Sequence, residues 1–213
     1  DAVIDVSGLN REQEKILIQS LNMECLKKFI FISSSAVYDV DDNSAPYNEE
    51  TPQKRNSFFC FYGTDKSEAE SFLKEKFAET DKSLIILRPP YVYGEDNYVQ
   101  RESFIFDHIC NDKPILIPGD GSTSLQFIYT TDLAEIIVEL LKKNTDLNAK
   151  YCVLSVSSML SPKQRDCVKT AIENSGLHII HFIEEAMCIG YYFKREFQLD
   201  EEYENWQNDT FLV

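Results

Sequence analysis

The sequence predicts an α/β protein built on a doubly wound parallel sheet, and three observations support this fold class. Short apolar runs alternate along the chain with segments of helical period, as they do in successive βαβ units. The apolar runs are continuous, which is typical of strands that are buried on both faces. The chain has 213 residues and is 43% hydrophobic, so it can bury a core of domain size.

The first part of the chain contains three expected strands and two expected helices. The strands are Val3–Ser7, Phe29–Ser33 and Leu84–Leu87, and the helices cover residues 11–24 and 61–78. The last of these strands is closed by Arg88-Pro89-Pro90, because proline is a strong signal for the end of a regular element.

The second part alternates in the same way. We expect helices over residues 101–111, 131–143 and 161–174, and strands at Ile115–Ile117, Gln126–Tyr129, Tyr151–Val156 and Leu177–Ile183. Asp132 near the start of the middle helix and Lys142 at its end suit the helix dipole. The segment Gly119-Asp120-Gly121 leads into a strand, not a helix, so we interpret it as a turn. The tail from Glu184 onwards carries no clear pattern.

Three consecutive serines, Ser33 to Ser35, stand where the second strand should end. Ligands bind beyond the carboxyl ends of the strands in open parallel sheets. Ser7-Gly8 and Pro89-Pro90 follow the neighbouring strands in the same way. We therefore expect these three segments to meet at one edge of the sheet.

Tyr62 and Lys66 lie four residues apart in the next helix, so they share a face. An ammonium near a tyrosine favours the ionised phenol, which can then exchange a proton with a substrate hydroxyl or carbonyl. With 11 Tyr in the chain, such a spacing arises easily by chance and is weak evidence by itself. Its position in the sequence, between the serine run and the double proline, is what supports a functional interpretation. The alternative is an ordinary surface helix, on which we also interpret Glu68 and Glu70 as exposed charges.

Together these residues resemble the extended short-chain dehydrogenase/reductase family, the NAD-dependent epimerase/dehydratase group. The segments SSSAVY, YGTDKSEAE, LRPPYVYG, PILIPGDGS and FIYTTDLAE occur in the family's order, over residues 1 to about 160. The sequences of several segments resemble those of an atypical subgroup, close to the chloroplast stem-loop-binding-like members. The resemblance implies that residues 1–93 are the C-terminal portion of a dinucleotide-binding domain. Residues 94–213 would form a mixed substrate-covering part, with some elements returning to the main sheet.

The resemblance assigns a role to individual residues and implies NAD or NADP as the cofactor. Ser34, four residues before Tyr38, would be the catalytic serine, Tyr62 the acid/base, and Lys66 the residue that binds the nicotinamide ribose. The cofactor-binding residues would be Ser7, Gly8, Ser33, Tyr62, Lys66, Pro89, Pro90 and Val92. The substrate-facing residues would be Ser35, Tyr91 and Arg101.

The sequence departs from the family in the part that binds the cofactor's phosphates. The family's glycine-rich turn after its first strand is absent, and the chain has 7 glycines in all. The resemblance begins at the family's fourth strand, and Asp1 stands inside a strand-like run. We therefore expect a Rossmann-like sheet that is incomplete at its N-terminal side, in a chain that is a fragment. Loss of cofactor binding is the alternative.

Two further departures concern the substrate. Nucleotide-sugar members of the family carry an asparagine at the position of Tyr91, and an arginine that clamps the diphosphate at the position of Leu125. A leucine cannot offer the guanidinium fork that phosphate recognition uses. Arg101 could supply an anion contact instead, or it could be a solvated residue at the start of a helix.

The net charge of −15 argues against nucleic acid as a partner, because binding to phosphates usually leaves a basic footprint. No apolar run is long enough to cross a bilayer, so a membrane is not expected as a partner either. The 6 cysteines have no zinc-ligand spacing, so no metal site is expected. We interpret Cys25, Cys110 and Cys152 as buried thiols in a reducing, cytoplasmic environment.

The function expected from this reading is NAD(P)-dependent epimerase/dehydratase-like chemistry on a small, sugar-derived hydroxyl or carbonyl substrate. A non-catalytic binding module, for RNA as in some relatives of the atypical subgroup, and a cofactor-free scaffold remain alternatives. The helices expected at 11–24 and 61–78 match those that pair in family dimers, so we expect a homodimer.

Overall fold

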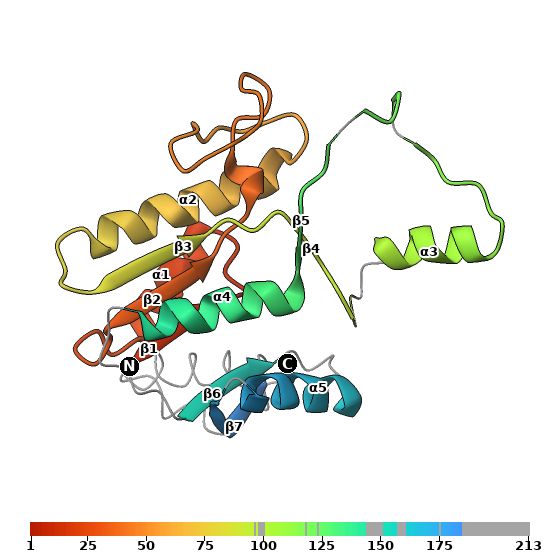
Figure 1. The fold of residues 1–213 in the computed structure, drawn as a ribbon. Coiled ribbons are helices and arrows are strands. Elements are labelled where there is room, and N and C mark those ends of the chain that lie inside the picture. Colours follow the sequence, from red (N-terminus) through yellow and green to blue (C-terminus); the bar gives the residue numbers. More distant parts are fainter. Residues whose placement is uncertain are drawn as a thin grey trace, which may run out of the picture. The chain divides into compact units, whose positions relative to one another are not determined.

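The computed structural model describes residues 1–95, 97, 101–117, 119–122, 124–143, 151–156, 161–174 and 176–184. The chain divides into two compact units, Asp1–Leu147 and Asn148–Val213. Figure 1 traces the elements of both units along the chain.

The first unit contains a three-stranded parallel sheet in the order β1-β2-β3. The strands are β1 (Ala2–Asp5), β2 (Lys28–Ile32) and β3 (Ser83–Leu87). Val3 pairs with Phe29, and Phe29 pairs with Leu84, so the central strand is bonded along both sides. All five residues of β2 are buried, as its continuous apolar run predicts.

Helices cover both faces of this sheet. The first face of β2 presents Phe29 and Phe31 to α1 (Arg11–Ser20) and α2 (Cys60–Phe77). The opposite face presents Ile30 and Ile32 to α4 (Thr130–Lys142). Figure 1 shows α2 and α4 on opposite sides of the three strands. The α/β class and the parallel, doubly covered sheet predicted from the sequence are confirmed.

A buried lysine joins the sheet to the end of α4. Lys28 is 1% exposed, and its ammonium donates hydrogen bonds to the carbonyl oxygens of Leu140, Leu141 and Lys143. These carbonyls belong to the last turn of the helix, which carries partial negative charge and has no donors of its own. Burial lowers the pKa of Lys28. The charge of Lys28 thus holds α4 against the sheet.

The chain continues from the sheet into a smaller pair of strands. A short 3-10 helix, η1 (Ser35–Val37), follows β2, and β4 (Tyr91–Tyr93) follows β3. β4 pairs in parallel with β5 (Phe127–Tyr129), while α3 (Glu102–Cys110) lies between them in sequence.

Two expectations for this part of the sequence were wrong. Residues Ile115–Ile117 form no strand, and Leu116 is 94% exposed, because this apolar run has no strand partner among the described residues. The expected burial of Cys25 and Cys110 was also wrong, since both thiols are exposed and Cys152 is half-buried. Cys25 lies in the loop before β2, and Cys110 ends α3, a helix without buried residues.

The second unit contains β6 (Tyr151–Val156), α5 (Pro162–Asn174) and β7 (His178–Glu184). The two strands are parallel neighbours, so the described residues of this unit form a βαβ motif. These bounds agree with the sequence prediction to within a residue at each end. The tail beyond Glu184, which the sequence left unassigned, lies outside the described residues.

Candidate functional site

The serine run forms a turn at the carboxyl end of β2. The backbone N–H of Ser33 donates to the carbonyl of Leu87 at 2.7 Å, and that of Ser35 donates to the carbonyl of Pro89 at 3.1 Å. The hydroxyl oxygen of Ser34 accepts from the N–H of Ala36 at 3.2 Å and thereby caps η1. Ser34 therefore has a fixed backbone, and no acceptor for its hydroxyl hydrogen lies among the described residues.

An asparagine fixes the start of α2 against this turn. The amide nitrogen of Asn56 donates to the carbonyls of Ala36 and Tyr38, both at 3.0 Å. Its amide oxygen accepts from the N–H groups of Phe58 and Phe59, at 3.1 and 2.8 Å. One buried side chain thus joins the serine turn to the turn that begins the helix of Tyr62.

The contact between α2 and the serine turn depends on a glycine. A Cβ on Gly63 would lie 2.3 Å from the carbonyl oxygen of Ala36, well inside the closest approach that real atoms make. Only glycine lets the helix backbone come this close, so Gly63 brings the neighbouring Tyr62 beside the serines.

Lys66 is buried under the same turn. Its ammonium donates to the carbonyl of Gly8 at 2.5 Å and to that of Ile32 at 2.8 Å, and it lies 4.9 Å from the centre of the Phe31 ring. The lysine therefore bridges the carboxyl ends of β1 and β2. Burial lowers the pKa of Lys66, while the nearby carboxyl groups of Asp5, Glu14 and Glu70 oppose that shift.

A cavity of about 580 Å³ opens where these segments meet. Of the predicted site residues, it is lined by Ser33, Ser34, Ser35, Tyr62, Lys66, Pro89, Pro90, Tyr91, Val92 and Arg101. Ser7 and Gly8 do not line it, although the carbonyl of Gly8 holds Lys66. The side chain of Tyr62 is 45% exposed, so a ligand in the cavity can reach it.

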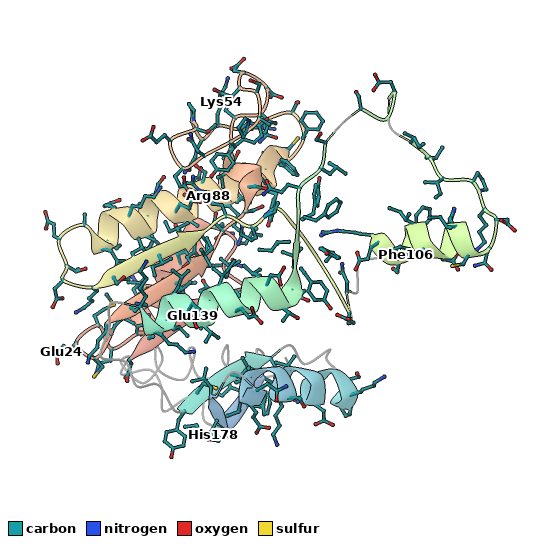
Figure 2. The ribbon with its side chains drawn as sticks, viewed as in Figure 1. Glu24, Lys54, Arg88, Phe106, Glu139 and His178 are labelled. Atoms are coloured by element: carbon teal, nitrogen blue, oxygen red, sulfur yellow. The ribbon has the colours of Figure 1, made fainter. Side chains whose placement is uncertain are left out.

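A buried ion pair under the serine turn was missed by the sequence reading. Glu70 is 0% exposed, which overturns its interpretation as a surface charge. Its carboxylate accepts from Arg88 at 2.8 and 2.6 Å and from the hydroxyl of Ser33 at 2.7 Å. Figure 2 labels Arg88 beside α2. The spacing of four residues between Lys66 and Glu70 was the available signal, because it places both on one helix face.

The pKa of Glu70 follows from these contacts. Burial alone would raise the pKa, but hydrogen bonds from Arg88, Ser33 and Gln53 outweigh burial and lower it. The hydrogen bonds that Arg88 donates to Glu70 correspondingly raise the pKa of Arg88. Both groups are therefore charged at neutral pH, and Glu70 anchors the side chain of Ser33.

Four apolar residues of the cavity wall were also missed: Val6, Ile32, Phe58 and Phe59. Phe58 is 77% exposed, close to the cavity, in the loop that leads into α2. Nothing in the local sequence separates such wall residues from ordinary core or loop residues, since their role depends on which loops meet.

A second cavity of about 420 Å³ adjoins the first. The two share Tyr91 and Arg101, and the second is otherwise lined by Tyr93, Glu102, Ile105, Leu125 and Phe127. The guanidinium of Arg101 lies 5.6 Å from the centre of the Tyr91 ring and donates to the carbonyl of Val92 at 3.3 Å. The wall around Leu125 is thus mostly aromatic and aliphatic.

The described residues contain no group of three or more His, Cys, Asp or Glu side chains placed to hold a metal ion. Within the same residues, no helix combines the length and the apolar character needed to cross a membrane.

Comparison with known proteins identifies relatives of this chain. Residues 10–153 match the model of the NAD dependent epimerase/dehydratase family. The chloroplast stem-loop binding protein of 41 kDa b from Arabidopsis thaliana is 28% identical over 144 residues, which are 66% of this chain and 34% of that protein. An N-acetyl-alpha-D-glucosaminyl-diphospho-ditrans,octacis-undecaprenol 4-epimerase from Escherichia coli O157:H7 is 26% identical over 169 residues, 73% of this chain and 49% of that protein.

Two further comparisons concern enzymes that act on nucleotide sugars. The human dTDP-D-glucose 4,6-dehydratase is 25% identical over 129 residues, which are 60% of this chain and 36% of that protein. The solved structure of a UDP-glucuronic acid 4-epimerase from Bacillus cereus, in complex with UDP-glucuronic acid and NAD, has a TM-score of 0.49 and 22% identity, covering 82% of this chain and 55% of that chain. The chain thus spans between a third and a half of the length of these curated relatives.

Proposed function

Because the chain belongs to the NAD dependent epimerase/dehydratase family, we propose that the 580 Å³ cavity is the reaction site of an NAD(P)-dependent epimerase, dehydratase or reductase. In this proposal the cavity receives the nicotinamide end of NAD or NADP together with a hydroxyl or carbonyl of a sugar-derived substrate. The observation that carries it is that Ser34, Tyr62 and Lys66, which come from two separate elements, line one cavity.

The residues present fit the nicotinamide and its ribose. Lys66 uses two of its three N–H donors on backbone carbonyls, and among the described residues no other acceptor takes the third. Pro89, Pro90 and Val92 offer an apolar wall for a ring. The 213 residues contain no glycine-rich phosphate turn, so no residue of this chain is assigned to the pyrophosphate.

When bound, the nicotinamide supplies or accepts a hydride. Tyr62 exchanges the proton of the substrate oxygen as the acid/base group. The hydroxyl of Ser34 already accepts from Ala36, so it donates its hydrogen to the same substrate oxygen and orients it. Lys66 lines the same cavity one helical turn after Tyr62, where its third N–H can donate to the ribose.

Residues beyond the main sheet contribute to the substrate side. Tyr91 and Arg101 line the cavity from β4 and from the start of α3. We propose that residues 94–213 supply the substrate-covering part, with Arg101 contacting an anionic or polar group. The apolar surroundings of Leu125 favour a substrate that does not place a diphosphate there.

The experiment that tests the proposal is a thermal shift with NAD and with NADP, on the full-length protein and on its Tyr62→Phe variant. A ligand at a hundredfold excess over its dissociation constant stabilises the folded state by about 2.7 kcal/mol. We expect the same shift in both proteins, because the variant keeps Lys66 and the apolar wall. The absence of any shift with either nucleotide would contradict the proposal and favour a cofactor-free scaffold.

One relative supports a second candidate function, RNA binding, because its name describes a chloroplast stem-loop binding protein. The charge of −15 opposes this candidate. If the full-length protein retards a stem-loop RNA in a gel, and the retardation weakens as salt rises, RNA binding is the better assignment.

A further inference from the structure

A pair of buried carboxyl groups lies behind the cavity, and the chemistry proposed above does not use it. Asp5 ends β1 and Glu14 lies in α1, and their exposed fractions are 7% and 0%. The Oδ2 atom of Asp5 and both carboxyl oxygens of Glu14 have no hydrogen-bond partner among the described residues. Buried oxygens without a donor are costly, so this pair requires an explanation.

Gly8 shows how close the two groups lie. A Cβ on Gly8 would stand 1.8 Å from Oε1 of Glu14 and 2.3 Å from Oδ2 of Asp5. The two oxygens are therefore neighbours beside the same backbone atom. Two ionised carboxylates would repel each other here, whereas one proton between them supplies the missing hydrogen bond. Burial, followed by the charge of Asp5, raises the pKa of Glu14 to about 9.

The balance of buried charge agrees with a protonated Glu14. The charged groups that face Glu14 and Lys66 are Asp5 from β1 and Glu70 from α2. Arg88 neutralises Glu70, and Asp5 is then left to neutralise Lys66. An ionised Glu14 would add a negative charge without a counter-ion.

The pair is connected to Lys66 through the turn after β1. Oδ1 of Asp5 accepts from the N–H groups of Ser7 and Gly8, at 3.0 and 2.9 Å. The carbonyl of Gly8 in this turn accepts from the ammonium of Lys66 at 2.5 Å. A displacement of Asp5 would therefore move the carbonyl that holds the lysine.

We propose that Asp5 and Glu14 share one proton and act as positioning residues for Lys66. Glu14 donates to Asp5, Asp5 holds the turn of Ser7 and Gly8, and the Gly8 carbonyl fixes the ammonium. The consequence for turnover rests on the proposed function, but the shared proton and the link to Lys66 do not.

The shared proton is tested by unfolding the protein at several pH values. Between about pH 4.5 and pH 9 the folded state keeps a proton that Glu14 releases on unfolding, so stability falls as pH rises. Glu14→Gln keeps a donor towards Asp5 but has no proton to release. The unfolding constant of the wild type relative to this variant should rise by about tenfold per pH unit in that window. Glu12→Gln, on the exposed side of α1, is the matched control and should show no such trend. A ratio independent of pH for Glu14→Gln overturns the shared proton.

The positioning role is tested by a double-mutant cycle between Asp5→Asn and Lys66→Met, again followed by unfolding. If Asp5 holds Lys66, the double variant should lose less stability than the two single variants lose in sum. The difference should amount to at least about threefold in the unfolding constant. Additive effects overturn the positioning role. In an active enzyme, turnover of the wild type should decline through the alkaline range while that of Glu14→Gln does not, which a purely structural role would not produce. An inactive wild type would refute the proposed function alone, because both unfolding tests would still decide this inference.

Discussion

Replacing Glu70 by glutamine should strongly destabilise the first unit, because it breaks a buried ion pair on one side only. Oε1 of Glu70 accepts from Ser33 and from Nε of Arg88, and Oε2 accepts from Nη2 of Arg88, from Gln53 at 2.9 Å and from Lys74 at 3.3 Å. Glutamine keeps one acceptor oxygen, but its NH₂ group replaces the second oxygen and cannot accept a hydrogen bond from the surrounding donors. Arg88, whose side chain is 11% exposed, then loses its counter-charge.

The magnitude follows from the burial of both partners. Removing one member of a buried ion pair costs about 3–5 kcal/mol, since the remaining charge stays out of water without compensation. The pKa of Glu70 is lowered in the folded state, so its contribution is present above the unfolded-state value of 4.5 and is lost as pH falls through the folded-state value. The difference between wild type and variant should therefore be largest near neutral pH and shrink in acid.

Urea denaturation followed by circular dichroism measures this difference, with Glu68→Gln as the matched control. Glu68 lies on the same helix but is exposed, so its replacement should change stability by about 0.5 kcal/mol or less. If Glu70→Gln unfolds at the same urea concentration as Glu68→Gln, the ion pair does not anchor the serine turn as described.

Two other substitutions probe the geometry around the site. Gly63→Ala should reduce turnover by about 10²-fold, since a Cβ placed 2.3 Å from the carbonyl oxygen of Ala36 forces α2 away from the serine turn by about 1 Å. Steady-state kinetics measure this loss, and unchanged turnover would show that the close contact is not required. Lys28→Met should lower the free energy of unfolding by about 1–3 kcal/mol, because three carbonyls at the end of α4 lose their donor. Amide exchange in α4 should be faster than in the exposed control Lys27→Met. Equal exchange in the two variants would contradict the anchoring role.

The parts of the fold that depend on local pattern could be predicted from the sequence. The apolar run of β2 and the Ser-Pro start of α5 predicted their elements to within a residue. The arrival of Ser33 to Ser35 at the carboxyl end of a strand pointed to the edge of the sheet at which ligands bind, and the structure has a cavity there that these serines line. The short β4 was missed because its partner, β5, is 36 residues downstream and a double proline precedes it.

The polar groups that support the site could not be predicted in the same way. Glu14, Lys28 and Glu70 are all fully or almost fully buried ionisable residues, and each belongs to a residue type that normally lies on the surface. Their partners are remote in sequence, as with Lys28 and the end of α4, more than a hundred residues later. Whether such a group can be buried depends on the tertiary partner that compensates it, and a local sequence pattern does not contain that partner.

The most direct test of the central claim is the turnover of the full-length Tyr62→Phe variant, with cofactor affinity measured on the same sample. We predict that NAD affinity is unchanged while turnover falls by at least about 10²-fold, the usual contribution of a positioned acid/base group. The exposed tyrosine variant Tyr151→Phe should behave as the wild type. A Tyr62→Phe protein that turns over substrate at the wild-type rate would contradict the assignment of this cavity as the reaction site.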